Sequence, residues 1–207
     1  MPTIVRAARL AALAAVAVAL ASCGGSSSDE GSTATTTAPS AEARAALDKG
    51  VADAQAAVKA SPRSAQALGA LVLAHYRAAS AGAHPAGTGY SAAGRAHLEA
   101  AANAWERLLA LDPKKPYTTA ASIMAVVYGK SGLDEPRKAV AAQLIVTQRR
   151  HDTSAYQQLA VMAYQSGDKR TGDLAAAQAV KRAPAADRKR IRDGLRQLRA
   201  GQFPGTG

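Results

Sequence analysis

The stretch "LAVMAYQSGD", residues 159–168, repeats an earlier part of the same chain. A shift of 35 residues superposes it on "MAVVYGKSG", residues 124–132, with apolar residues, alanines and a glycine in matching places. In both copies an apolar segment runs into polar residues and then a glycine, as a helix runs into a turn. A period of this length indicates an array of repeated helical units.

Apolar residues elsewhere in the chain recur at spacings of three and four, which is the period of an amphipathic helix. The alternation typical of strands is missing almost everywhere, and aromatic residues make up only 4% of the chain. Helices rich in alanine bury little area each, so they need close partners. We therefore expect an all-α fold. The clearest series are Leu68, Leu71, Val72 and His75, and Leu98, Ala101, Ala102 and Trp105.

The second copy, extended from Tyr156 to Pro184, resembles a tetratricopeptide repeat (TPR). That unit is a helix-turn-helix of about 34 residues with the pattern W-x2-L-G-x2-Y, then A-x3-F, then P. Tyr156 stands in place of the tryptophan and Ala160 in place of the small glycine. Gly172 and Ala176 depart from the usual alanine and aromatic of the second helix.

The resemblance covers residues 41–184 and implies a solenoid of helix pairs, although another helix-pair solenoid fits the same period. An earlier unit has its first helix at 64–79 and its second helix around Trp105, followed by Pro113. Between them we expect an insertion at 80–94, which is either a functional loop or a tolerated surface insertion. The middle unit has its second helix at 136–149.

Residues 185–200 are predicted to form a capping helix with Ile191, Leu195 and Leu198 on one stripe, followed by a disordered tail at 201–207. The stretch 181–199 holds eight basic and two acidic residues, in a chain of formal net charge +11. This basic face would suit anionic lipid headgroups, wall polymers or an acidic protein, or it is a solvated face of the cap. The candidate contacts are Arg188, Lys189, Arg192 and Arg196.

The first 22 residues have the layout of an export signal, with Arg6 and Arg9 before the uncharged run "LAALAAVAVAL". This run is shorter than the roughly 20 apolar residues that span a bilayer. The following "LASC" resembles the bacterial lipobox, in which the cysteine receives a diacylglyceryl group before cleavage at its amino side. The resemblance implies a lipoprotein signal peptide at 1–22 and fatty-acylated Cys23 on the extracytoplasmic side of a bacterial membrane. An ordinary signal peptide is the alternative.

Residues 23–40 contain no large apolar side chain after Cys23, so we expect a flexible linker between the lipid and the domain. Cys23 is also the only cysteine in the sequence. The exported domain therefore forms no intramolecular disulfide and depends on packing for its stability.

The TPR resemblance implies a concave groove lined by the first helix of each pair, which would bind protein or peptide partners. The paired lysines and asparagines with which some TPR domains hold a terminal carboxylate are missing from the matching positions. The lining would comprise Gln66, Leu73, Tyr76, Arg77, Thr119, Ser122, Val126, Lys130, Gln157, Val161, Tyr164 and Gln165.

Catalytic signals are weak. The four histidines are scattered, and the sequence holds neither the His-Glu-x-x-His spacing of a zinc site nor a phosphate-binding Gly-x4-Gly-Lys motif. We predict no enzyme, cofactor or metal site, although an active site in the inserted loop stays an alternative. The export signal and the lack of stacking aromatics beside the basic residues disfavour nucleic acid. The sequence favours a membrane-anchored scaffold, with an anionic-surface binder as its rival.

Overall fold

The computed structural model of the chain describes residues 40–81, 89–112 and 117–202, and its regular elements within these ranges are helices. The prediction of an all-α fold is confirmed. The eight α-helices are α1 (Ala41–Ala60), α2 (Ala65–Ala81), α3 (Ala92–Ala110), α4 (Thr118–Val127), α5 (Pro136–Arg150), α6 (Thr153–Gln165), α7 (Lys169–Arg182) and α8 (Arg188–Arg199), with a short 3-10 helix (Ala185–Asp187) before α8.

Side chains in the sequence fix where most of these helices begin. In each case a serine or aspartate oxygen accepts a hydrogen bond from the backbone N–H three residues further on, at 2.7–3.2 Å. The predicted cap at Ser40 is among them, and α5 starts instead with a proline in its first turn. The capping residues are Ser40, Ser64, Ser91, Asp152 and Asp168.

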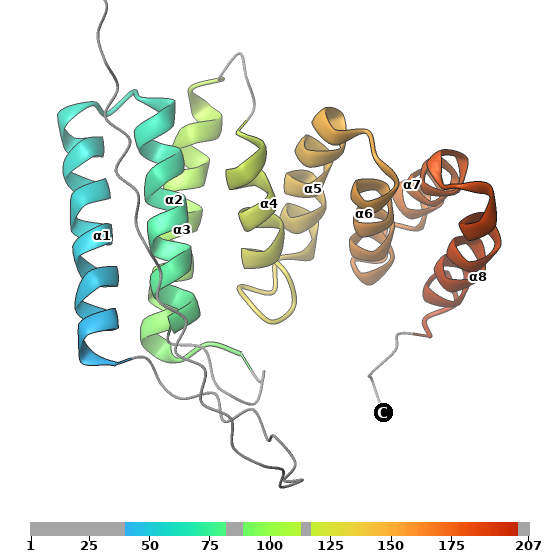
Figure 1. Cartoon of the computed structure of the whole chain (residues 1–207), viewed down its shortest axis with the longest axis horizontal. Helices are drawn as coiled ribbons and strands as arrows, with labels where there is room; N and C mark the ends of the chain where they lie inside the picture. Colours follow the sequence, from blue (N-terminus) through green and yellow to red (C-terminus); the bar gives the residue numbers. More distant parts are fainter. Residues whose placement is uncertain (1–39, 82–88, 113–116, 203–207) are drawn as a thin grey trace, which may run out of the picture. The chain divides into compact units, whose positions relative to one another are not determined.

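The helices pack in sequential pairs, so that each one lies against the next along the chain (Figure 1). Two further contacts join helices that are separated by one element: α2 packs on α4, and α6 packs on α8. As a result α8 lies against α6 and α7 in the same way that α4 lies against α2 and α3.

The buried apolar side chains form two clusters rather than one continuous core. The larger cluster joins α1 to α5 around Leu68, Leu98 and Trp105, which are at most 3% exposed. The smaller cluster joins α6, α7 and α8 around Leu159 and Ile191. The predicted apolar stripe of the last helix therefore packs against the end of the stack.

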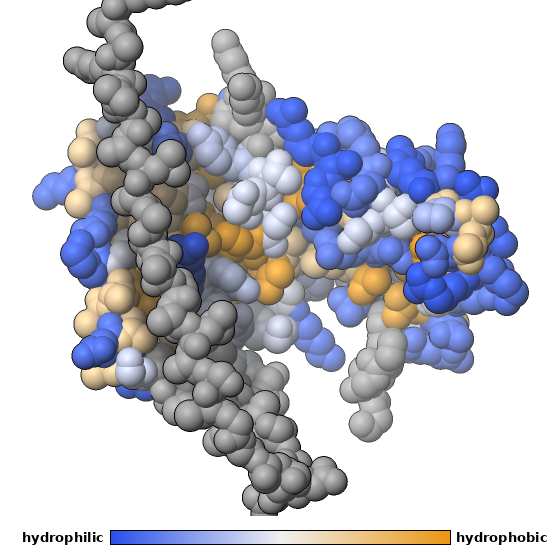
Figure 2. Space-filling view, in the orientation of Figure 1, coloured by the Kyte–Doolittle hydropathy of each residue, from blue (hydrophilic) through white to orange (hydrophobic). Residues whose placement is uncertain are grey.

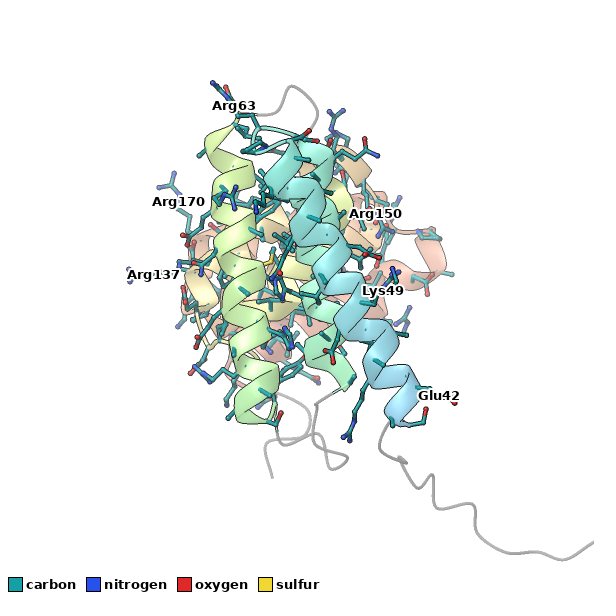
Figure 3. All side chains as sticks on the ribbon, turned by 90° about the vertical axis from the view of Figure 1, so that its left-hand side faces the viewer. Glu42, Lys49, Arg63, Arg137, Arg150 and Arg170 are labelled. Atoms are coloured by element: carbon teal, nitrogen blue, oxygen red, sulfur yellow. The ribbon has the colours of Figure 1, made fainter. Side chains whose placement is uncertain are left out.

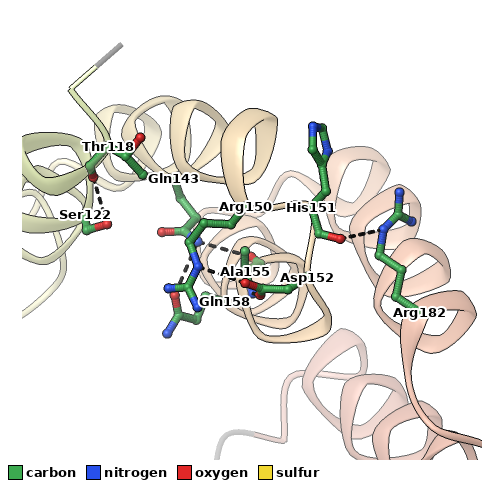
Figure 4. A network of polar contacts seen from close by, with 9 residues as sticks. All are labelled: Thr118, Ser122, Gln143, Arg150, His151, Asp152, Ala155, Gln158 and Arg182. Atoms are coloured by element: carbon green, nitrogen blue, oxygen red, sulfur yellow. Dashed lines mark hydrogen bonds and ion pairs between the residues drawn. The ribbon is translucent and has the colours of Figure 1, made fainter. Parts of the chain in front are cut away.

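The contact between α5 and α6, where the two clusters meet, contains buried polar groups. Gln143 on α5 is only 2% exposed, and its Nε2 donates to the carbonyl oxygen of Ala155 at 3.1 Å and to Oε1 of Gln158 at 3.3 Å (Figure 4). Arg182 of α7 reaches the same region, because its Nε donates to the carbonyl oxygen of His151 at 2.8 Å. Since buried polar groups are costly when unpaired, the two hydrogen bonds of Gln143 fix the register of α5 against α6. The exposed hydrogen bond of Arg182 joins α7 to the turn between these two helices.

The two glycines that the repeat superposes are required for different reasons. Gly167, between α6 and α7, has a φ of +80°, which is unfavourable for other residues. Gly132, between α4 and α5, leaves no room for a side chain, because a Cβ there would lie 2.1 Å from the carbonyl oxygen of Val127. The same oxygen accepts the N–H of Leu133 at 2.8 Å, so this close approach holds the turn together.

The connection between α2 and α3 is shorter than the insertion that the sequence predicts at 80–94. Residues 80 and 81 continue α2, and α3 already begins at Ala92, because Ser91 caps it. The predicted signal peptide at 1–22, Cys23 and the linker up to residue 39 lie outside the described residues, as does the predicted tail from residue 203 onward. Of the helices that are described, none is both long and apolar enough to cross a membrane.

Two histidines meet between α2 and α3. Nδ1 of His75 lies 3.1 Å from Nδ1 of His97, so one ring donates and the other accepts. His75 is 6% exposed, and burial, together with the nearby charge of His97, lowers its pKa. His97 also lines a hollow with Arg44 and Asp48 of α1.

This histidine pair predicts that the domain loses stability as the pH falls from about 7.5 to about 5.5. The pKa of His75 is lower in the folded than in the unfolded chain, so the unfolded chain binds more protons in this range. Urea unfolding followed by circular dichroism measures the effect. His75→Gln removes the titrating group and should flatten this part of the profile. An unchanged slope in the variant would contradict the assignment.

Candidate functional site

A groove runs between α7 and α8 and has a volume of about 610 Å³. Its floor is apolar, and cationic side chains stand along its sides, which is the composition of a binding site for an anionic partner with an apolar face. We call it the α7–α8 groove. It is lined by Tyr164 from α6, by Asp173, Ala176, Ala177, Val180 and Lys181 from α7, and by Arg192, Leu195, Arg196 and Arg199 from α8.

The helical period explains how α8 builds its side of the groove. Arg192, Arg196 and Arg199 are spaced by four and three residues, so they share one face of the helix. Leu195 lies beside this stripe and is 5% exposed. On α7 the small side chains of Ala176 and Ala177 belong to the apolar floor of the groove.

One hydrogen-bonded network ties the three helices together at one end of the groove. The Tyr164 hydroxyl donates to Oδ1 of Asp173 at 3.0 Å, and Arg199 donates to both oxygens of the same carboxylate at 2.7 and 3.1 Å. The hydrogen bonds from Arg199 and then from Tyr164 lower the pKa of Asp173, while burial and the carboxylate raise that of Tyr164 to about 12. The only carboxylate of the groove lining is therefore neutralised in place.

The remaining cations leave the groove with an excess of positive charge. Within the part of the chain that the structure describes, Lys181 and Arg192 form no ion pair. Arg196 lies 3.6 Å from Asp193 of its own helix, with a side chain that is 71% exposed. An exposed ion pair of this kind contributes little to stability, so Arg196 can leave Asp193 and pair with another anion.

The basic residues predicted on the last helix divide into two groups. Arg192 and Arg196 line the groove. Arg188 instead donates to the carbonyl oxygen of Ala183 at 3.0 Å, and Lys189 pairs with Asp193 at 2.9 Å. The sequence prediction did not include Arg199 or Lys181, although the spacing of Arg199 from Arg192 and Arg196 is a signal that could have found it.

The residues predicted to line a concave groove lie on the first helix of each pair, apart from Lys130, which lies in the turn after α4. Val126 is 45% exposed, whereas Tyr164 is 8% exposed and faces α7. Within the described residues α4 and α6 are not in close backbone contact. The set occupies α2 (Gln66, Leu73, Tyr76, Arg77), α4 (Thr119, Ser122, Val126) and α6 (Gln157, Val161, Tyr164, Gln165).

Two of the smaller hollows on the described surface lie between α6 and α8 and between α3 and α5. Gln157 and Val161 of α6 line one of about 240 Å³ together with Ile191 and Leu198 of α8. The other, of about 250 Å³, lies between α3 and α5 and is bridged by the ion pair of Lys138 with Glu106 at 3.2 Å. The first of these brings two residues of the predicted lining next to the last helix.

Hydrophilic and apolar residues are unevenly distributed over the face drawn in Figure 2. Hydrophilic residues cover much of the face in Figure 2 over α5 to α8, whereas apolar residues gather there between α2 and α4. The charged side chains labelled in Figure 3, Arg137, Arg150 and Arg170 among them, are exposed and lie on the outside of the helices. The α7–α8 groove differs from them because its cations border an apolar floor.

The described residues contain no group of three or more histidine, cysteine, aspartate or glutamate side chains that could hold a metal ion. Comparison with known proteins gives no family: no family model matches the chain, and no curated protein or solved structure is significantly similar to it. What the structure defines is an all-α domain of eight described helices packed in sequential pairs, with a basic groove between the last two.

Proposed function

We propose that this chain is a lipid-anchored protein of the bacterial cell envelope, whose TPR-like helical repeats bind protein or peptide partners on the extracytoplasmic side of the membrane. The observation that carries the proposal is a stack of helices in sequential pairs that leaves an apolar, cation-lined groove open to solvent. Stacks of helix pairs present extended surfaces of this kind to peptides and helices. We assign the chain no catalytic, cofactor-binding or metal-binding role.

The TPR-like part of the proposal is supported by the agreement between the sequence period and the packing. Ala125 and Ala160, which the repeat superposes, are 1% and 0% exposed, as expected where helices approach closely. Tyr164 lies on Gly172, so the glycine that departs from the TPR pattern makes room for a large ring. The Tyr164 ring thus fills the space that the small Gly172 leaves, and the unit stays packed despite its departure from the TPR pattern.

The anchoring part rests on the sequence around Cys23. Each buried methylene of an acyl chain contributes about 0.8 kcal/mol, so two or three chains hold a protein firmly where one chain holds it weakly. Anchored in this way, the helical domain would be presented to partners close to the membrane.

The proposal is tested in the cell envelope with a photo-crosslinking side chain placed at Val126 or at Gln157, both on first helices. Both positions should capture the same protein. A crosslinker at Arg63, which is exposed between α1 and α2, is the control. If Val126 and Gln157 capture proteins no more often than Arg63 does, the result would contradict a partner-binding scaffold.

The lipid anchor is tested separately. Cys23→Ala should move the protein out of the membrane fraction while its helical circular dichroism stays unchanged.

A second candidate is the binding of an anionic lipid or wall polymer through α8. Six basic residues and one acidic residue in this helix favour it. Charge reversal at Arg188, Lys189, Arg192 and Arg196 in a chain lacking Cys23 should then abolish membrane association. Unchanged association would rule this candidate out.

A further inference from the structure

We propose that the α7–α8 groove receives an acidic amphipathic helix of a partner protein. The pairs within the chain are α2–α3, α4–α5 and α6–α7, and the partner helix would pack on α8 as the second helix of a fourth pair. This inference rests on the proposed partner-binding function, and it names the chemistry of one helix of the partner and the place where that helix binds.

The order of the helices indicates what the groove is for. α4 packs on α2 and α3, and the next helix, α5, then packs on α4. α8 packs on α6 and α7 in the same arrangement, but no helix follows it within the described residues. Among the described residues, the α7–α8 groove therefore lies where a first helix has no second helix packed on it. A helix from another protein can supply the missing contact.

The 35-residue period of the sequence also leads to the face of α8 that lines the groove. The shift of 35 residues that superposes Ala125 on Ala160 next reaches Leu195. All three residues are buried, and Leu195 also lines the α7–α8 groove. The 35-residue period thus leads from buried helix contacts to a residue of the groove lining.

The lining of the groove selects an amphipathic helix. Ala176, Ala177 and Val180 form an apolar strip along α7, and Leu195 faces it from α8. Small side chains at a helix contact let a second backbone approach closely. A partner helix with apolar residues at spacings of three and four would place them on this strip.

The charges of the groove select an acidic helix. Lys181, Arg192 and Arg196 stand along the apolar strip, and Asp173 is already held by Arg199 and Tyr164. Glutamates flanking the apolar stripe of a partner would meet these cations, while a basic partner would be repelled. A bilayer would instead meet the outer cations of α8, such as Lys189, whose side chain is 87% exposed.

The test uses the full chain in detergent and a fluorescent helical peptide of about 15 residues, similar in length to α7 and α8. The peptide carries leucines at spacings of three and four and glutamates beside them. Its control carries lysine in place of every glutamate. Fluorescence anisotropy should show binding of the glutamate peptide and affinity for the lysine peptide at least about tenfold lower.

Three variants locate the binding site. Arg192→Glu with Arg196→Glu should weaken binding of the glutamate peptide at least about tenfold and favour the lysine peptide. Lys189→Glu with Arg190→Glu changes the net charge equally on the same helix outside the groove, and should change the affinity less than about threefold. Ala177→Trp, which fills the groove without changing its charge, should also prevent binding. Circular dichroism checks that each variant is folded.

The inference is overturned if the glutamate peptide does not bind, or if the two charge reversals weaken its binding equally. It is also overturned if phosphatidylglycerol vesicles bind in place of the peptide and lose binding in the groove variant alone. Recurrent crosslinks from Val126 and Gln157 combined with no binding in the groove would leave the scaffold function standing and remove only this site. Peptide binding without any recurrent crosslink would remove the scaffold function instead.

Discussion

Gly132→Ala is expected to lower the free energy of unfolding by about 3 kcal/mol or more. The new Cβ would lie 2.1 Å from the carbonyl oxygen of Val127 and 2.9 Å from its carbon. Both atoms belong to the backbone, so no side-chain rotation relieves the clash. The turn between α4 and α5 must open, which breaks the hydrogen bond from the N–H of Leu133 to the same oxygen.

Gly167 provides the matched control, since it occupies the equivalent place in the next repeat. A Cβ there meets nothing within 4 Å, and only its φ of +80° is unfavourable. Gly167→Ala should cost about 1 kcal/mol, and Gly167→Asn less, because asparagine tolerates this conformation. Urea unfolding followed by circular dichroism compares the variants. If Gly132→Ala and Gly167→Ala lower the free energy of unfolding equally, the backbone clash described at Gly132 is contradicted.

Gly172→Ala is expected to destabilise the domain by about 2 kcal/mol, although alanine in a helix is normally favoured by about 1 kcal/mol. A Cβ at this position would lie 2.4 Å from Cε1 of the Tyr164 ring. The ring cannot move away without breaking the hydrogen bond of its hydroxyl to Asp173, which also holds Arg199 of α8. The substitution should therefore loosen α8 as well as α7.

Gly194→Ala, in α8, is the control for helix propensity, because nothing lies within 4 Å of a Cβ built there. It should stabilise the domain by about 0.5–1 kcal/mol. Combining Gly172→Ala with Tyr164→Leu should cost less than the sum of the two single substitutions, since a smaller side chain leaves room for the Cβ. If the two costs simply add, the ring and the glycine are not in the contact described.

Most helices could be predicted because their signals are local. The apolar period, the serine and aspartate caps and the proline that opens α5 all act within a few residues. The different roles of Gly132 and Gly167 could not be predicted in this way. Both are glycines after a helix, but one is set by its φ and the other by a backbone approach that exists only in the folded turn.

The candidate site was predicted only in part, for a similar reason. The basic stripe of α8 is visible in the sequence, so Arg192 and Arg196 were among the predicted contacts. Their position beside an apolar strip depends on how α8 packs on α7, which no spacing within one helix reveals. Tyr164 was predicted as a surface of the groove, but its ring lies on Gly172 and its hydroxyl is held by Asp173.

Hydrogen exchange of the full chain, with and without the glutamate peptide, tests most directly whether a partner helix completes the last pair. The account predicts that exchange slows in α7 and α8, on both sides of the groove, and stays unchanged in α2 and α4. Protection confined to α2, α4 and α6, or no protection in any helix, would contradict it.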